Sequence, residues 1–137
     1  MDRARYDDYL ACFNRRDYDA VLAFWAADSE IVFAGYGLRG REQMRAFYRF
    51  FHQYVAETVH PSAFISNDRM LVIEATVRLE ALQTLTPEVA ASNGFGRLFC
   101  LRQGQVIEVP QFIHYHLDEQ GQFTKALCAV FEAPHSR

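Results

Sequence analysis

The sequence predicts an α+β domain in which three N-terminal helices pack on a curved, mainly antiparallel sheet. Apolar residues recur at helical spacing through residues 2–57, and they alternate with other residues along residues 59–82 and 106–131. The 137 residues contain no repeat, linker or low-complexity stretch. Residues 1–137 are therefore expected to form a single domain around one core.

Three segments carry the apolar periodicity of amphipathic helices. Residues 2–16 have aromatic and aliphatic side chains at i, i+3, i+4 and i+7, which predicts a first helix. Asp17 is expected to cap a second helix that ends near Asp28. A third helix is predicted over residues 41–57, with His52 on its solvated face.

The middle of the chain predicts a strand, a loop and a hairpin. Residues 30–34 read as a brief strand, and residues 35–40 contain three glycines, which indicates a loop. Residues 59–66 and 69–82 are predicted as two strands joined by the polar turn Asn67–Asp68. Alternation along the second of these strands directs its apolar row toward the core.

The last third of the chain predicts a second hairpin. Residues 106–117 and 122–131 are its strands, and residues 118–121 supply the turn. Alternation directs one row of the first strand toward the core: Ile107, Val109, Gln111, Ile113, Tyr115 and Leu117. Residues 84–105, with a helix start at Thr86, are longer than a hairpin connection needs, so we expect this insertion to cover one end of a cavity.

Composition and charge argue against several partners and sites. The net charge is −3 and no Lys/Arg cluster is present, so neither nucleic acid nor an anionic membrane is an expected partner. The N-terminus lacks the apolar region of a signal peptide, and we expect a cytoplasmic protein. Cys12, Cys100 and Cys128 are far apart, which predicts reduced thiols in the core rather than a disulfide or a zinc site.

Aromatic residues are unusually frequent. They make up 15% of the chain, with twelve Phe and seven Tyr, which is more ring surface than a small core requires. This excess indicates a pocket for a flat or hydrophobic ligand. A tightly packed interior or a dimer interface would use the same residues, and composition favours none of the three.

Three motifs occur in a recognisable order. They are the stretch from residue 9 to residue 28, the run GREQMRAFY at residues 40–48 and the run HYHLDEQGQF at residues 114–123. Together they resemble the opening helices, third helix and last hairpin of the nuclear-transport-factor-2-like superfamily. The resemblance implies a cone-shaped, cystatin-like α+β barrel and covers nearly the whole chain except residues 85–105. This superfamily includes SnoaL-like polyketide cyclases, ketosteroid isomerases, scytalone dehydratase-like hydro-lyases and non-catalytic binding modules.

Position by position, the resemblance argues against a ketosteroid isomerase. Tyr9 matches the helix-one tyrosine that donates to the oxyanion in those enzymes. Their two carboxylates would fall at Phe33 and Ile113, and this chain therefore lacks the required base. In SnoaL-like cyclases the acid/base aspartate would fall near Cys128, and no neighbouring cation in the sequence argues for an activated thiol.

The hydro-lyases give a closer match. His60 corresponds to their catalytic histidine, and Asn14 to the carboxylate that orients it. A surface-turn histidine is the alternative for His60, and core packing is the alternative for Tyr9 and Tyr115. His114 lies on the mixed row of its strand, where the outer sheet face or a dimer contact is the simpler explanation.

These residues predict a cofactor-independent isomerase, cyclase or dehydratase that acts on a hydrophobic, polyketide-like carbonyl compound without a metal. The expected catalytic residues are His60, Tyr9, Tyr115, Asn14 and His114. The expected pocket residues are Phe33, Tyr36, Tyr48, Phe51, Ile113 and Cys128. The alternative is a module of the same fold that binds a ligand or dimerises without turnover. A homodimer formed through the outer sheet face is expected in either case.

Overall fold

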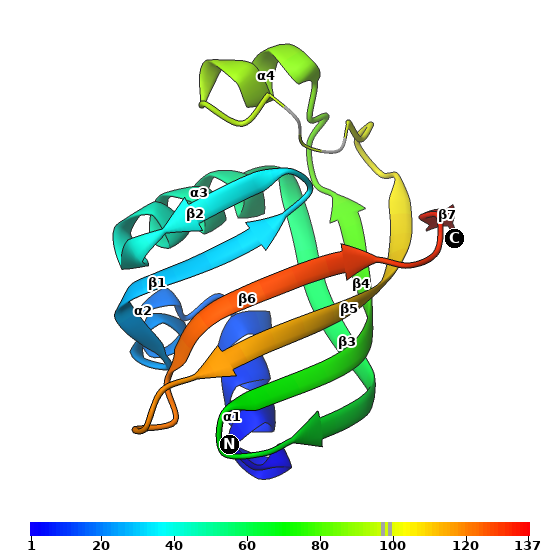
Figure 1. The fold of residues 1–137 in the computed structure, drawn as a ribbon. Coiled ribbons are helices and arrows are strands. Elements are labelled where there is room, and N and C mark those ends of the chain that lie inside the picture. The colour runs from blue at the N-terminus through cyan, green and yellow to red at the C-terminus, as the bar shows by residue number, and fades with distance from the viewer. Residues whose placement is uncertain (97, 99) are drawn as a thin grey trace.

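The computed structural model describes residues 1–96, 98 and 100–137. Figure 1 shows the helices and strands along these residues. In chain order they are α1 (Arg3–Asn14), α2 (Tyr18–Ala23), β1 (Trp25–Phe33), β2 (Tyr36–Arg39), α3 (Gly40–Tyr54), β3 (Val55–Ser66), β4 (Met70–Ala81), α4 (Pro87–Ser92), β5 (Val106–Leu117), β6 (Phe123–Val130) and β7 (His135–Ser136).

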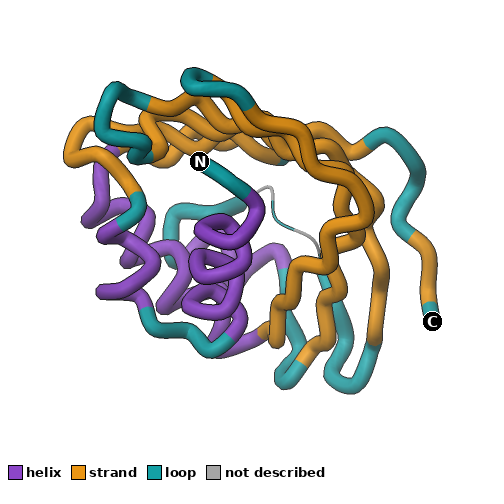
Figure 2. The backbone as a smooth tube through the Cα atoms, turned by 90° about the horizontal axis from the view of Figure 1, so that it is seen from below, coloured by secondary structure: helices purple, strands orange, loops and turns teal. Residues whose placement is uncertain are grey.

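One curved sheet forms the frame of the molecule. Its strand order is β2-β1-β6-β5-β4-β3, and β7 pairs with β5 beyond the end of β6. Every pair is antiparallel except β1 with β6. Figure 2 shows the strands arching around the helices, which fill the concave side. The predicted α+β fold, with three N-terminal helices on a mainly antiparallel sheet, is confirmed.

The first two helices begin at side-chain caps. Asp2 accepts a hydrogen bond from the backbone N–H of Arg5 at 2.9 Å, and the predicted cap Asp17 accepts one from Ala20 at 3.2 Å. The predicted end of the second helix near residue 28 is wrong, because α2 stops at Ala23. Trp25, only 1% exposed, already belongs to β1 and anchors that strand in the core.

Two predicted boundaries around α3 also need correction. The glycine-rich segment after residue 34 is not a loop: β2 pairs with β1 across a turn in which Ala34 and Gly35 have φ of 46° and 82°. The third helix ends at Tyr54 rather than at residue 57. From Val55 onward the backbone is extended, so Glu57 lies on a strand and not in a helical turn.

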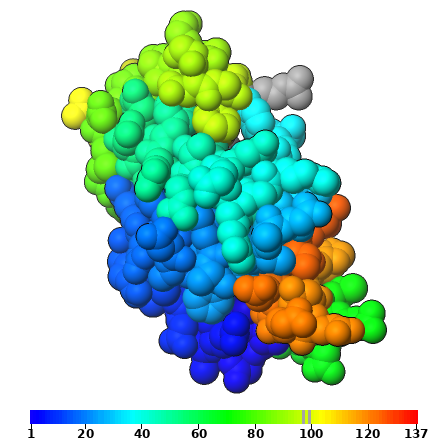
Figure 3. Space-filling view, turned by 90° about the vertical axis from the view of Figure 1, so that its left-hand side faces the viewer, coloured from blue at the N-terminus to red at the C-terminus, as the bar shows by residue number. Residues whose placement is uncertain are grey.

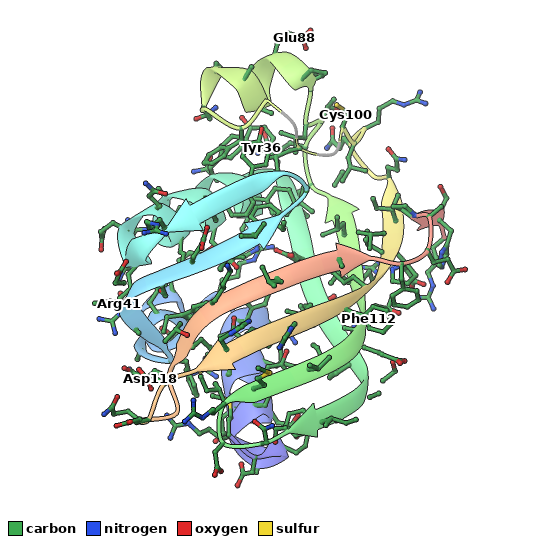
Figure 4. All side chains as sticks on the ribbon, viewed as in Figure 1. Tyr36, Arg41, Glu88, Cys100, Phe112 and Asp118 are labelled. Carbon is green, nitrogen blue, oxygen red and sulfur yellow. The ribbon has the colours of Figure 1, made fainter. Side chains whose placement is uncertain are left out.

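The two predicted hairpins are confirmed. Asn67 accepts hydrogen bonds from the backbone N–H groups of Arg69 and Met70, which closes the β3–β4 turn. Asp118 does the same at the β5–β6 turn, where Figure 4 labels it. The predicted inward row of β5 is buried except for Gln111, which is half-buried. Since the inner rows pack on the helices, they bound whatever space lies between the two layers.

The segment between β4 and β5, which includes α4, lies at one end of the sheet. Thr86 caps α4 by accepting a hydrogen bond from Val89, and Phe95 packs on Phe47 of α3 with ring centroids 5.2 Å apart. Figure 3 shows this segment, in yellow-green, above the α3 region. Residues 97 and 99 of the predicted insertion lie outside the described residues. No helix in the described ranges is long and apolar enough to cross a membrane.

Candidate functional site

A cavity of about 130 Å³ lies between the inner face of the sheet and the helices α1 and α3. Its wall is mostly aliphatic and aromatic. The polar side chains on the wall are few: Tyr9, Tyr48, Glu57, Gln111, Tyr115 and Cys128. An apolar hollow with a small number of polar groups is the usual form of a small-molecule site.

Two of these polar groups belong to a cluster of tyrosines between α1 and β5. Tyr9 and Tyr115 are each 4% exposed, and the hydroxyl of Tyr115 lies 3.1 Å from that of Tyr6. Burial raises the pKa of all three phenols well above the ordinary value of 10.0. These tyrosines, here called the hydroxyl cluster, are therefore neutral hydrogen-bond donors and not bases.

Glu57 lines the cavity from β3, the edge strand of the sheet. Val55 and Val59 are buried on the same face of that strand, so the alternation of the strand turns Glu57 inward with them. Its side chain is 17% exposed. Among the described residues that line the cavity, Glu57 has the only charged side chain.

A buried histidine holds this carboxylate. His52 Nε2 lies 2.9 Å from Glu57 Oε2, and His52 Nδ1 lies 2.8 Å from the hydroxyl of Tyr18. The prediction of a solvated His52 is wrong, since the residue is only 3% exposed. Tyr18 of α2 packs against the imidazole and shields it from solvent. Glu57, His52 and Tyr18 are here called the carboxylate chain.

Of the three cysteines, Cys128 lies on the cavity wall, whereas Cys100 is exposed and its predicted place in the core is wrong. Burial, with a smaller contribution from the negative charge of Glu57, raises the pKa of Cys128 to about 12. The thiol is thus protonated at neutral pH and is a poor nucleophile. No group of three or more His, Cys, Asp or Glu side chains is arranged to hold a metal ion within the described part of the chain.

Most of the predicted pocket residues do line the cavity. Tyr9 and Tyr115 are on its wall, together with five of the six side chains predicted for the pocket: Phe33, Tyr48, Phe51, Ile113 and Cys128. Tyr36 is the exception. Its ring packs on Phe33 and Phe95, and Figure 4 shows it beneath α4, outside the lining residues.

The other predicted catalytic residues do not reach the cavity. His60 is exposed, because it follows Val59 on β3 and so faces outward, and it is not among the described residues that line the cavity. Asn14, at the end of α1, accepts a hydrogen bond from the backbone N–H of Val59 at 3.3 Å and ties the helix to the sheet edge. His114 lies on the outer face, stacked on His116 at 4.8 Å.

The carboxylate chain was not predicted from the sequence. Glu57 could have been placed inward because it is two residues from both Val55 and Val59, and alternate residues of a strand face the same side. That reasoning applies only if the strand is known to start at residue 55. His52 and Tyr18 are 34 residues apart, and their contact depends on how α2 packs on α3. Periodicity within one helix carries no information about such a contact.

With this geometry known, comparison with other proteins identifies relatives. A family model described as a SnoaL-like domain matches residues 6–126. No curated protein matches the sequence. Several solved structures share the nuclear-transport-factor-2-like fold at identities too low to indicate more than the fold.

Three of these structures illustrate the range. A candidate polyketide cyclase from Xanthomonas campestris is 24% identical, covers 88% of this chain and 82% of its own, and has a TM-score of 0.70. RV0760c from Mycobacterium tuberculosis, in complex with estradiol-17beta-hemisuccinate, is 17% identical, with 90% and 88% coverage and a TM-score of 0.66. A computationally designed 17-OHP binder is 15% identical, with 96% and 95% coverage and a TM-score of 0.71.

Proposed function

The chain belongs to the SnoaL-like domain family, and we propose that it is a cofactor-independent isomerase, cyclase or dehydratase acting on a small, hydrophobic, polyketide-like carbonyl compound. One observation carries the proposal. Glu57 presents a carboxylate to a cavity whose described lining is otherwise uncharged and mostly apolar, and neutral tyrosine hydroxyls stand on the same wall. A base and hydrogen-bond donors are the two parts that enolisation requires.

In the proposed reaction Glu57 removes a proton from the carbon next to the carbonyl group. The C–H bond breaks, and its electron pair moves into the enolate, whose charge develops on the carbonyl oxygen. Tyr9 or Tyr115 donates a hydrogen bond to that oxygen. Tyr6 supports Tyr115, because a Tyr6 hydroxyl that donates to the Tyr115 oxygen leaves the Tyr115 proton free for the substrate.

The protonated Glu57 then completes the cycle. It returns its proton to another carbon in an isomerisation or to a departing hydroxyl group in a dehydration. In a cyclisation the enolate carbon forms a bond to a second carbonyl carbon of the substrate, whose oxygen becomes an alkoxide and takes the proton from Glu57. In each case Glu57 becomes a carboxylate again. Exclusion of water from the cavity strengthens each of these electrostatic interactions. The base is thus assigned to Glu57 rather than to His60, and Asn14 contributes by fixing the strand that carries Glu57.

Hydrogen exchange tests the proposal without knowledge of the natural substrate. The protein is mixed in D₂O with a panel of cyclic and aryl ketones, and deuterium incorporation next to the carbonyl is followed by NMR. We expect the wild type to catalyse exchange with at least one ketone and Glu57→Gln to lose it while ligand-observed NMR still detects binding. Absence of exchange for the entire panel, or full exchange by Glu57→Gln, contradicts the proposed reaction.

A second candidate is a module that binds the same class of ligand without turnover. His52 already pairs with one oxygen of Glu57, an arrangement that also satisfies a purely structural carboxylate. The designed binder shows that the fold can bind a small molecule. Binding of a ketone by both wild type and Glu57→Gln, with no exchange by either, supports this candidate.

We also propose that two copies associate through the outer face of the sheet. Val72 and Leu127 are each 36% exposed and flank His114 on neighbouring strands, and Phe112 nearby is 40% exposed. His114 Nε2 is buried with no hydrogen-bond partner among the described residues. Sedimentation at micromolar concentration tests the dimer. Leu127→Glu should yield a monomer, and Leu82→Glu, which lies beyond the end of β4 and ten residues from Val72, should not. A monomeric wild type removes the proposal.

A further inference from the structure

We propose that His52 and Tyr18 are positioning residues for Glu57. Tyr18 sets the tautomer of His52, and His52 binds one carboxylate oxygen so that the other faces the substrate. The inference rests on the proposed role of Glu57 as the base. It adds two residues, neither on the cavity wall, to the groups that determine the rate.

The geometry at the carboxylate separates its two oxygens. Oε2 of Glu57 is 2.9 Å from His52 Nε2, whereas Oε1 has no hydrogen-bond partner among the described residues. The side chain lines the cavity. An ionised carboxylate only accepts hydrogen bonds, so the oxygen without a donor is the one able to take a proton from a ligand.

The hydrogen bond between Tyr18 and His52 fixes the direction of the chain. The Tyr18 hydroxyl is 2.8 Å from Nδ1 and 3.4 Å from the backbone carbonyl oxygen of Tyr48, so the imidazole nitrogen is the nearer acceptor for its proton. Burial raises the pKa of Tyr18, so the phenol keeps that proton. When that hydroxyl donates to Nδ1, the ring hydrogen of a neutral imidazole must be on Nε2, where it is donated to Glu57. In the opposite tautomer a lone pair of Nε2 would face a carboxylate oxygen of Glu57, and the two acceptors would repel each other.

Neighbouring rings prevent the imidazole from turning away. It stacks on Tyr18 at an interplanar angle of 18° and on Tyr48 at 24°, and Phe13 meets it edge-on at 80°. The backbone carbonyl of His52 accepts a hydrogen bond from Arg16 at 3.0 Å. The orientation of His52 is therefore set before any ligand binds.

This arrangement suits a base in an apolar cavity. Burial disfavours the charged form of any carboxyl group, and a hydrogen bond donated to the charged form favours it. His52 donates such a bond from outside the cavity and so occupies none of the space that the substrate needs. Pre-orientation of a reacting group is worth large factors in rate, because small displacements reduce the rate steeply.

NMR of the imidazole nitrogens tests the tautomer independently of any activity. In ¹⁵N-labelled wild type we expect a protonated Nε2 and an unprotonated, hydrogen-bonded Nδ1 at His52. Tyr18→Phe keeps the stacked ring and removes the hydroxyl, so the Nδ1 resonance should move toward that of a free nitrogen. Tyr54→Phe, on the same helix as His52, is the control and should leave it in place. A protonated Nδ1 in the wild type, or no shift in Tyr18→Phe, overturns the inference.

The exchange assay tests the effect on rate. Tyr18→Phe should lower kcat about tenfold, and His52→Phe about 10²-fold, with KM within about twofold of wild type. His52→Gln, whose amide N–H can donate to Glu57, should recover much of the loss. Wild-type kcat in both Tyr18→Phe and His52→Phe overturns the positioning role while leaving Glu57 as the base. Lack of exchange by the wild type is instead a failure of the proposed reaction, and the NMR result still decides the tautomer.

Discussion

The cavity has two polar regions, and they differ in almost every physical respect. The hydroxyl cluster of Tyr6, Tyr9 and Tyr115 consists of neutral phenols, two of which are joined by the hydrogen bond between Tyr6 and Tyr115. The carboxylate chain runs from half-buried Tyr18 through His52 to a charged group on the cavity wall.

The comparison shows how one residue type acquires two tasks. Tyr115 has another phenol as its hydrogen-bond neighbour, whereas Tyr18 has an imidazole. In the proposed mechanism Tyr115 keeps its proton for the ligand, and Tyr18 donates to His52 so that His52 donates to Glu57. A donor and a base can therefore coexist in one small apolar cavity because they are held by separate elements, α1 and β5 in one case, α2, α3 and β3 in the other. The predictions below test that division.

The largest effect is expected from removing both cavity-facing hydroxyls of the hydroxyl cluster. Tyr9→Phe combined with Tyr115→Phe should slow exchange about 10³-fold, since no cluster hydroxyl remains to meet the developing oxyanion. Tyr6→Phe is the comparison variant. It should lower the unfolding free energy by about 1 kcal/mol and reduce the exchange rate much less than the double variant does. An unchanged exchange rate in the double variant would mean that the donor is another polar residue of the wall, Tyr48 or Gln111, and would contradict the assignment of the donor to the hydroxyl cluster.

A shorter acid should disturb the carboxylate chain. Glu57→Asp keeps the charge but withdraws the carboxylate by one methylene from both His52 and the ligand, so exchange should fall about 10²-fold. Glu74→Asp makes the same change on the outer face of β4, where the side chain is exposed, and should have no effect. Equal rates for Glu57→Asp and wild type would show that the position of this carboxylate is unimportant.

Alkaline pH should destabilise the folded chain. In the folded chain Cys128 has a pKa of about 12, against an ordinary 9.0. Between these values the unfolded chain releases the proton and the folded chain retains it, so stability falls as pH rises, by at most about 1.4 kcal/mol per pH unit for one group. The raised pKa values of Tyr9 and Tyr115 act in the same direction above pH 10.

Urea unfolding across this alkaline range measures the loss. Cys128→Ala removes one of the contributing groups, and its stability should therefore decline less steeply with pH than that of the wild type. Parallel curves for the two proteins would mean that Cys128 ionises alike in the folded and unfolded chains.

The smallest effect is expected at the histidine that belongs to neither region. His60→Ala should change the unfolding free energy by less than about 0.5 kcal/mol and leave exchange unaltered, because the side chain is exposed on the outer face. A large loss of exchange would return His60 to the mechanism and place a reacting group outside the cavity.

Much of the fold follows from local pattern. The alternation along residues 71–81 predicts the buried row of β4 without error, since one face of that strand meets only apolar neighbours. The boundary at Val55 was missed for a physical reason. Apolar residues continue at helical spacing from Phe47 through Phe51 to Val55, and no glycine or proline interrupts residues 41–60. The chain therefore changes from helix to strand without a glycine, a proline or a break in the apolar spacing to indicate the boundary.

The site was less predictable than the fold. Tyr9, Tyr115 and most pocket residues follow from amphipathic faces that must point inward. The burial of His52 depends on a neighbouring helix, and the direction of Glu57 depends on the strand boundary. Functional groups that rely on contacts between separate elements leave little trace in a single sequence.

Trp25 has a practical consequence. It is the only tryptophan of the chain, it is 1% exposed, and it lines the cavity. Its intrinsic fluorescence therefore originates at the cavity wall, and a ligand that enters should quench or shift that emission. Occupancy can be titrated with the unlabelled protein, one compound after another, before any turnover is known.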